Sequence, residues 1–232
     1  MNFKTALAAL LAISATACVS APPAPPASAE GVAPSGMPTT PQGWRTAALS
    51  DLDALRTEIH DNTPIALDTE NLATLRWFNE GYRAARERAE HARDQAGYYY
   101  ALLSYTAGFR DAHLGLSAKM HLAPARWPGF VTTAHGDDVV VFYRDDHYPS
   151  APPLGARVIS CDGRTLDAYR ARYIYPFTLN PAFADDRRRS AARIFMDRHN
   201  PFGPAPRRCV FESNGRQTTL TLNWRALPDG DA

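Results

Sequence analysis

The sequence has 232 residues, of which 45% are hydrophobic and 21% are charged, and its formal net charge is +1. This is an ordinary globular composition, and the length suffices for one or two domains with a hydrophobic core. The small net charge excludes a bulk electrostatic attraction to nucleic acid or to an anionic membrane. We therefore expect no nucleic-acid partner.

The N-terminus has the pattern of a targeting segment that does not belong to the fold. A lysine precedes an apolar run over residues 6–13, which is too short to span a bilayer and is typical of a secretory signal. We predict a signal peptide over residues 1–17. Small residues then precede Cys18, as in the lipobox of bacterial lipoproteins, whose signal is cut on the N-terminal side of the cysteine and whose cysteine is lipidated. An ordinary cleavage near Ala17 or Ala21 is the alternative.

Residues 18–43 are rich in proline and alanine, which is the composition of an extended tether without a core. Such a spacer supports lipidation at Cys18, because spacers of this kind hold a domain away from a membrane. We predict an exported, periplasmic protein that contacts the membrane only through this lipid anchor.

Two further cysteines, Cys161 and Cys209, remain after the N-terminal segment. In an exported protein they are expected to form a disulfide, since one ends a predicted strand beside a turn and the other begins a predicted hairpin. Two buried free thiols are the alternative. The sequence contains no C-x-x-C pair, so we expect no zinc knuckle. We also expect no other metal and no cofactor.

Three helices are predicted over residues 44–112, where they form a small antiparallel unit. The first begins at Ser50 and ends before Pro64, and the second opens at Thr69. The third carries aromatic and apolar residues at three- and four-residue steps. We expect Gly108 to end it, because glycine accepts the left-handed backbone of a C-terminal cap.

An aspartate and a histidine two residues apart, Asp111 and His113, follow the third helix. Leu114 and Leu116 come next, and their alternation predicts the start of a strand. A junction of this kind holds a side chain rigidly while its tip stays exposed. The segment alone nevertheless favours an aspartate that caps a turn beside an ordinary histidine.

Residues 113–226 have the alternating pattern of a small, mostly antiparallel β-domain with inserted helical segments, and residues 227–232 form a tail. The predicted fold class is therefore α+β, with the three-helix unit at the N-terminus. Strands are expected at residues 130–134, 139–143, 155–163, 208–211 and 218–224, and helices at residues 166–173 and 187–197.

Two segments resemble those of a known family. Asp111-Ala112-His113 resembles the Asp-Gly-His-Thr signature of C-terminal-processing and tricorn-like serine peptidases, with alanine in place of glycine and leucine in place of threonine. Residues 154–163, followed by a helix, resemble the strand and turn of the PDZ-like domain that these peptidases carry. The resemblance covers residues 49–224. It implies a helical cap over 44–112 and a PDZ-like domain over 113–226.

The resemblance also implies roles for single residues. His113 matches the general base that activates a serine, and Asp111 would orient it. The family places its nucleophile and oxyanion donors in a following domain, at a Gly-Gly-x-Ser turn, and this sequence contains no Gly-Gly pair. A second branch uses a serine–lysine dyad, but Lys119 does not occupy the matching place. We therefore expect a chain that stops before the catalytic serine domain.

Three functional hypotheses follow. The first is a serine-peptidase-family protein without its serine domain, which binds a peptide or a protein C-terminus and is not proteolytic alone. The second is a stand-alone periplasmic PDZ-like lipoprotein that adds a peptide to a sheet edge. The third is a small metal site or hydrolase that uses His113 with His121 or Asp111, although two ligands fall short of a metal site.

Overall fold

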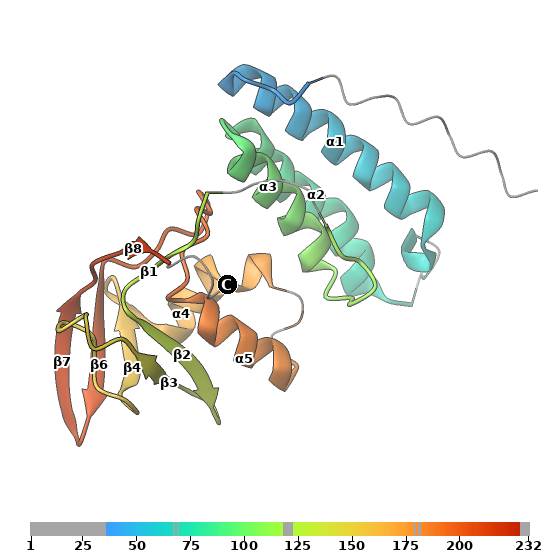
Figure 1. Ribbon diagram of the computed structural model, residues 1–232. Coiled ribbons are helices and arrows are strands. Elements are labelled where there is room, and N and C mark those ends of the chain that lie inside the picture. The colour runs from blue at the N-terminus through green and yellow to red at the C-terminus, as the bar shows by residue number, and fades with distance from the viewer. Residues whose placement is uncertain are drawn as a thin grey trace, which may run out of the picture. The chain divides into compact units, whose positions relative to one another are not determined.

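The computed structural model describes residues 36–66, 68, 70–117, 123–178, 180 and 182–227, and all of its helices and strands belong to the unit Pro38–Ala232 (Figure 1). The predicted signal peptide, Cys18, most of the tether, and both Lys119 and His121 lie outside the described residues. So does the predicted tail except for its first residue. The fold class is α+β, which confirms the prediction from sequence.

Three helices make up the N-terminal part and pack against one another. Their apolar side chains share one core, around the fully buried Leu52 and Tyr105. The helices are α1 (Pro41–Asn62), α2 (Leu72–Glu90) and α3 (Gln95–Gly108), with the short 3-10 helix η1 (Pro64–Ala66) between the first two.

The starts of the first two helices differ from the prediction. α1 begins nine residues before Ser50, because Thr40 accepts a hydrogen bond from the Gly43 backbone N–H and Pro41 fits the first helical position. α2 begins three residues after Thr69, where Asn71 caps it. The polar residues closest to each true start provide the cap in both cases.

α3 ends at Gly108 as predicted, but the reason predicted for this glycine is wrong. Gly108 is the last residue of α3 and does not have a positive φ; the left-handed residue is Arg110, with φ of 58°. Gly108 is required for packing instead, because a methyl group there would lie 1.9 Å from Cζ2 of Trp77. A methyl group at Gly81 would meet the same indole, at 2.3 Å from Cε2. Nε1 of this indole donates to the Tyr105 carbonyl at 3.0 Å.

The predicted strand start at Leu114 and Leu116 is also wrong, since residues 114–117 form no strand. Both leucines are half-buried and pack against the core of the three helices. Their alternation therefore reflects a loop that turns every second side chain toward an apolar surface, without pairing to another strand.

A twisted antiparallel sheet forms the second part, in the order β2-β3-β4-β6-β7, with β5 paired to β4. β1 and β8 pair separately. The strands are β1 (Arg126–Trp127), β2 (Phe130–His135), β3 (Asp138–Arg144), β4 (Arg157–Cys161), β5 (Arg164–Thr165), β6 (Arg208–Ser213), β7 (Arg216–Thr221) and β8 (Arg225–Ala226).

Two helices and a short 3-10 helix interrupt the strands between β5 and β6. α4 (Leu166–Tyr173) has the predicted bounds, and Thr165 caps it; η2 (Tyr175–Phe177) follows. α5 (Ala184–Arg193) begins three residues earlier and ends four residues earlier than predicted. α5 packs on β2, where the Thr132 hydroxyl donates to the Ala191 carbonyl at 2.7 Å.

The sheet has its own core, which is separate from that of the helices. Phe130 of β2 lies against Phe195, with 4.7 Å between ring centroids, and against Phe211 of β6 at 5.6 Å. This aromatic cluster ties the segment after α5 to two strands of the sheet. None of the described helices combines the length and the apolarity that crossing a bilayer requires.

The contact between Trp77 and Gly108 generates a testable prediction. Gly108→Ala should lower the free energy of unfolding by about 1–3 kcal/mol, because the new methyl group overpacks the indole and the ring must move away from the Tyr105 carbonyl. Gly115→Ala is the matched control, because nothing lies within 4 Å of its methyl position. It should change stability by less than about 0.5 kcal/mol. Equal urea midpoints for the two variants would contradict the packing argument.

Candidate functional site

Asp111 and His113 lie together just after α3. The Asp111 carboxylate accepts a hydrogen bond from the His113 backbone N–H at 2.9 Å and lies 2.8 Å from His113 Nδ1. The His113 side chain is 94% exposed. The structure thus places the two predicted residues in contact, with the outer ring nitrogen of the histidine in solvent.

The same arrangement recurs elsewhere in the chain. Asp145 accepts from the His147 backbone N–H at 2.8 Å and lies 2.7 Å from its Nδ1, and this histidine is 92% exposed. Asp197 likewise accepts from the His199 backbone N–H at 2.8 Å. An aspartate that bonds the backbone two residues on is a common turn device. The geometry at Asp111 and His113 is therefore that of an Asp-x-His turn. The same Asp-x-His spacing at three places in the sequence was the available signal for this turn.

A nucleophile does not accompany His113 in the described part of the chain. The hydrogen bonds of His113 there go to Asp111 alone, and no serine, threonine or cysteine side chain is among its partners. No group of three or more histidine, cysteine or acidic side chains that could hold a metal ion occurs among the described residues. The structure brings Asp111 and His113 together, and their roles as orienting carboxylate and general base stay predictions.

Cys161 and Cys209 lie opposite each other on β4 and β6 and are joined by a disulfide. Their Cα atoms are 4.1 Å apart and both residues are buried. The bond closes a loop with a sequence separation of 48 residues that contains α4, η2 and α5. Closing a loop of this length stabilises a fold by about 3–4 kcal/mol in the chain-entropy account.

β7 is an edge strand with unpaired backbone groups. Asn214 and Gly215 both have positive φ, of 52° and 72°, which defines the two-residue turn that pairs Ser213 with Arg216. From this turn onward, every second residue of β7, beginning with residue 216, exchanges backbone hydrogen bonds with β6. The bond from the Leu222 N–H to the Arg207 carbonyl continues this even-numbered series. The backbone N–H and C=O groups of residues 217, 219 and 221 consequently point away from β6. In the part of the chain that the structure describes, no strand pairs with this edge.

A cavity of about 300 Å³ lies on the face of β6 and β7. Alternate residues of the two strands form its floor, and the proline-rich segment 149–153 forms another wall. The sequence predicts this segment only as a loop, because its contact with β6 and β7 depends on the tertiary fold. The lining residues are Pro149, Ser150, Ala151, Pro152, Pro153, Ala156, Phe211, Ser213, Arg216, Thr218 and Leu220.

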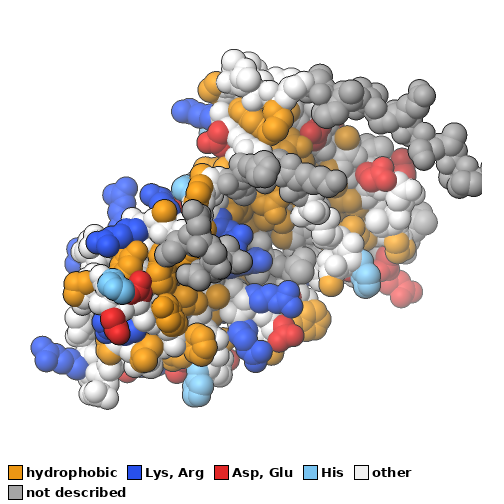
Figure 2. Space-filling view, viewed as in Figure 1, with side chains coloured by type: hydrophobic (Ala, Val, Ile, Leu, Met, Phe, Trp, Pro, Cys, Tyr) orange, Lys and Arg blue, Asp and Glu red, His pale blue; other side chains and the backbone are white. Residues whose placement is uncertain are grey.

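The surface carries no large field of one sign on the face shown in Figure 2, where basic, acidic and hydrophobic side chains are interspersed. Several arginines pair with nearby carboxylates. Arg157 bonds both Asp138 and Glu212, at 3.3 and 2.8 Å, and Arg188 lies 3.6 Å from Asp185.

Comparison with known proteins gives a fold and no family. No protein-family model matches the sequence, and no curated protein matches it. The crystal structure of mature CPAF is similar with a TM-score of 0.57 at 15% identity, covering 81% of this chain and 36% of that chain. The crystal structure of the CPAF s499a mutant is similar with a TM-score of 0.56 at 16% identity, covering 80% and 35%.

This chain thus spans about a third of the length of the CPAF chains that it matches. CPAF is a serine protease. The likeness shows that the present chain shares the fold of the part of CPAF that it matches. That confirms the coarser part of the resemblance read from the sequence. The PDZ-like assignment of residues 113–226 stays a prediction.

The Asp111–His113 turn makes a prediction about acid titration. The hydrogen bond from the His113 backbone N–H, and then that from its side chain, hold the pKa of the Asp111 carboxyl below its ordinary value of 3.8. The pKa of Asp145 is shifted in the same direction by His147 for the same reasons. The stabilisation is present above the ordinary value and is lost as the pH falls through the lowered one.

We expect His113→Ala to raise the pKa of Asp111 only part of the way to 3.8, because the larger, backbone hydrogen bond remains. Carbon-13 NMR titration of the carboxyl groups measures this, and Asp145 serves as the internal control that should not move. A full return to the ordinary pKa would mean that the imidazole, and not the turn, controls the carboxylate.

Proposed function

We propose that this chain is an exported, peptide-binding protein of protease-related fold that does not cleave peptides alone. The observation that carries the proposal is the edge of β7, which no other described strand pairs, beside the cavity on the β6–β7 face. An extended peptide placed on this edge would bond the outward groups of residues 217, 219 and 221. Its alternate side chains would lie over the face that Thr218 and Leu220 line.

The fold likeness supports a peptide as the ligand. CPAF is a serine protease, and the backbone groups of an edge strand recognise extended peptide chains irrespective of sequence. Residues 113–226 would act in this proposal as a PDZ-like domain. The ligand would be an internal peptide segment or the C-terminus of a protein.

His113 would act in catalysis only together with a serine from outside the described residues. Its imidazole is exposed and is oriented through Nδ1 by Asp111, which is the arrangement a general base needs. A base without a nucleophile or oxyanion donors lacks the largest contributions to acyl transfer. We therefore propose peptide binding, and not hydrolysis, as the activity of this chain by itself.

Export and anchoring complete the proposal. The N-terminal pattern up to Cys18 supports secretion and lipidation, and the disulfide between Cys161 and Cys209 supports an oxidising compartment such as the periplasm.

Peptide addition at β7 predicts a specific sensitivity to proline. Thr219→Pro should abolish binding, because it removes an outward N–H without removing a bond to β6. Thr219→Val keeps the N–H and is the matched control, with affinity within about twofold of the original. Fluorescence anisotropy with a library of labelled octapeptides measures both variants, after circular dichroism has shown equal folding. Unchanged binding by the proline variant would exclude this edge, and absence of any peptide binding would refute the proposed function.

A second prediction concerns hydrolysis. The purified chain should show no labelling of serine by a fluorophosphonate probe and no turnover of a fluorogenic peptide library. A lone histidine base accelerates a reaction by only about 10²–10⁴-fold, which is far below the rates that proteolysis requires. Serine labelling together with turnover that His113→Ala abolishes would instead show a complete enzyme.

A third prediction concerns the N-terminus. Mass spectrometry of the protein from membranes should find diacylglycerol on an N-terminal Cys18, and Cys18→Ser should abolish this modification. A mature terminus at Ala21 or later would contradict lipidation and leave export standing.

A further inference from the structure

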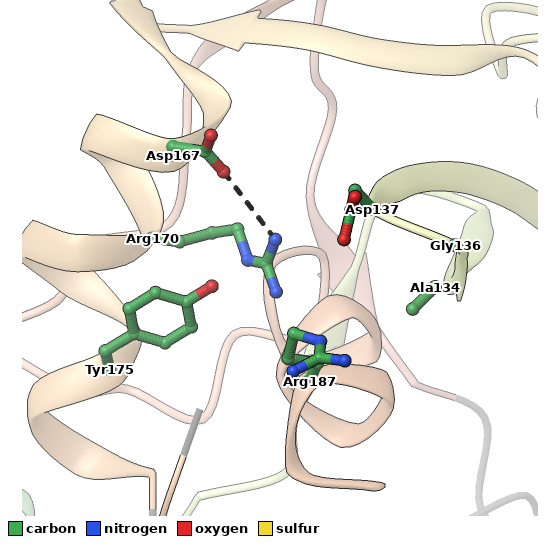
Figure 3. A pocket seen from close by; sticks show the side chains of 7 residues that line it. All are labelled: Ala134, Gly136, Asp137, Asp167, Arg170, Tyr175 and Arg187. Carbon is green, nitrogen blue, oxygen red and sulfur yellow. Dashed lines mark ion pairs between the residues drawn. The ribbon is translucent and has the colours of Figure 1, made fainter. Parts of the chain in front are cut away.

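A second cavity, of about 320 Å³, lies between the turn that joins β2 to β3 and the segments of α4, η2 and α5 (Figure 3). It differs from the first because most of its lining side chains are charged. The lining residues are Ala134, Gly136, Asp137, Asp167, Arg170, Tyr175 and Arg187.

Arg170 is the unusual member of this lining. Its side chain is only 5% exposed, although an arginine is always charged. Its Nη2 donates to the Ser190 hydroxyl at 3.2 Å, and its Nη1 lies 3.8 Å from the Asp167 carboxylate, beyond hydrogen-bond distance. Nε is buried without a partner among the described residues. Within the described part of the chain, this buried guanidinium makes one hydrogen bond and one ion pair, to Asp167, so its five donors are incompletely satisfied.

Arg187 brings a second positive charge to the same space. Its Nη1 donates to the Ala182 carbonyl at 2.6 Å, which holds the side chain at the N-terminal end of α5. Figure 3 shows the Arg170 guanidinium pointing from α4 toward the middle of the lining residues, with Arg187 on the far side. The Tyr175 ring lies under Arg170, with 5.0 Å between its centroid and Cζ. The two cations therefore face one space from two helices.

Two carboxylates limit what this space can accept. Asp167 is 90% exposed and Asp137 lies in the exposed turn between β2 and β3, so both belong to the rim. They repel a doubly charged anion more strongly than a singly charged one. A planar, singly charged group also matches the fork of a guanidinium.

We propose that this cavity binds a single carboxylate, held between Arg170 and Arg187. The carboxylate belongs to a small organic acid or to a peptide, and the chemistry of the site is the same for both. The site is separate from the edge of β7, and the inference does not rest on peptide binding there.

The test uses nitrogen-15-labelled mature protein and follows the arginine Nε–H signals by NMR at constant ionic strength. The probes are acetate, inorganic phosphate, acetyl-Ala-Ala-Ala with a free carboxylate, and the same peptide as its amide. Acetate should shift the Arg170 signal saturably and bind more tightly than phosphate. Arg187→Gln should weaken acetate binding about tenfold. Arg188→Gln removes the same charge from an exposed side chain on the same helix. It should leave the affinity for acetate within about twofold of that of the unmodified protein.

Asp167→Asn supplies a variant that works in the opposite direction, because removing a rim carboxylate should tighten acetate binding about fivefold. The variants at Arg187 and Asp167 make it unnecessary to use Arg170→Gln, which removes a buried side chain and endangers folding. Binding of the peptide acid but not of the amide identifies a peptide carboxylate as a ligand. Binding of acetate but of neither peptide identifies a small acid, and both results support the site.

Three results would overturn the proposal: a shift that stays linear with acetate concentration, tighter binding of phosphate than of acetate, or equal effects of Arg187→Gln and Arg188→Gln. The Thr219→Pro variant separates this site from the proposed peptide edge, because it should retain acetate binding whether or not peptides bind at β7.

Discussion

The pairing of β4 with β6, closed by the bond between Cys161 and Cys209, is the constraint on which the sheet depends. β4 carries β3 on its other side, and β6 carries β7, so both halves of the sheet are joined through this one pair. The chain between the two cysteines contains α4, η2 and α5. The disulfide therefore fixes the two ends of the segment that forms most of the charged cavity, and it also holds the strand that presents β7 to solvent.

Local chemistry made much of this fold predictable. α4 begins and ends where its pattern predicts, and the Thr165 side chain caps its start by accepting from the Ala168 N–H. The hairpin around Asn214 and Gly215 follows from two residues that tolerate positive φ. The third helix was predicted as well, but the reason for its last glycine was not. Gly108 is set by an indole from another helix, and no local pattern reports such a contact.

The site was less predictable than the fold. Asp111 and His113 are close in sequence, so their contact followed from spacing, yet the same turn at Asp145 and at Asp197 shows that spacing alone does not define a catalytic pair. The two cavities were not foreseen at all. Arg170 and Arg187 are far enough apart in the sequence that only the packing of α4 and α5 brings them to one space.

The indole of Trp77 has a consequence for how this chain can vary. It occupies the room that side chains at Gly81 and Gly108 would need, and its N–H bonds the backbone of α3. A larger residue at either glycine is compatible with the fold only if position 77 becomes smaller, and a smaller residue at 77 leaves a void unless a glycine grows. In related chains, residues at positions 77, 81 and 108 should therefore covary: a change at one of them should be accompanied by a compensating change at another.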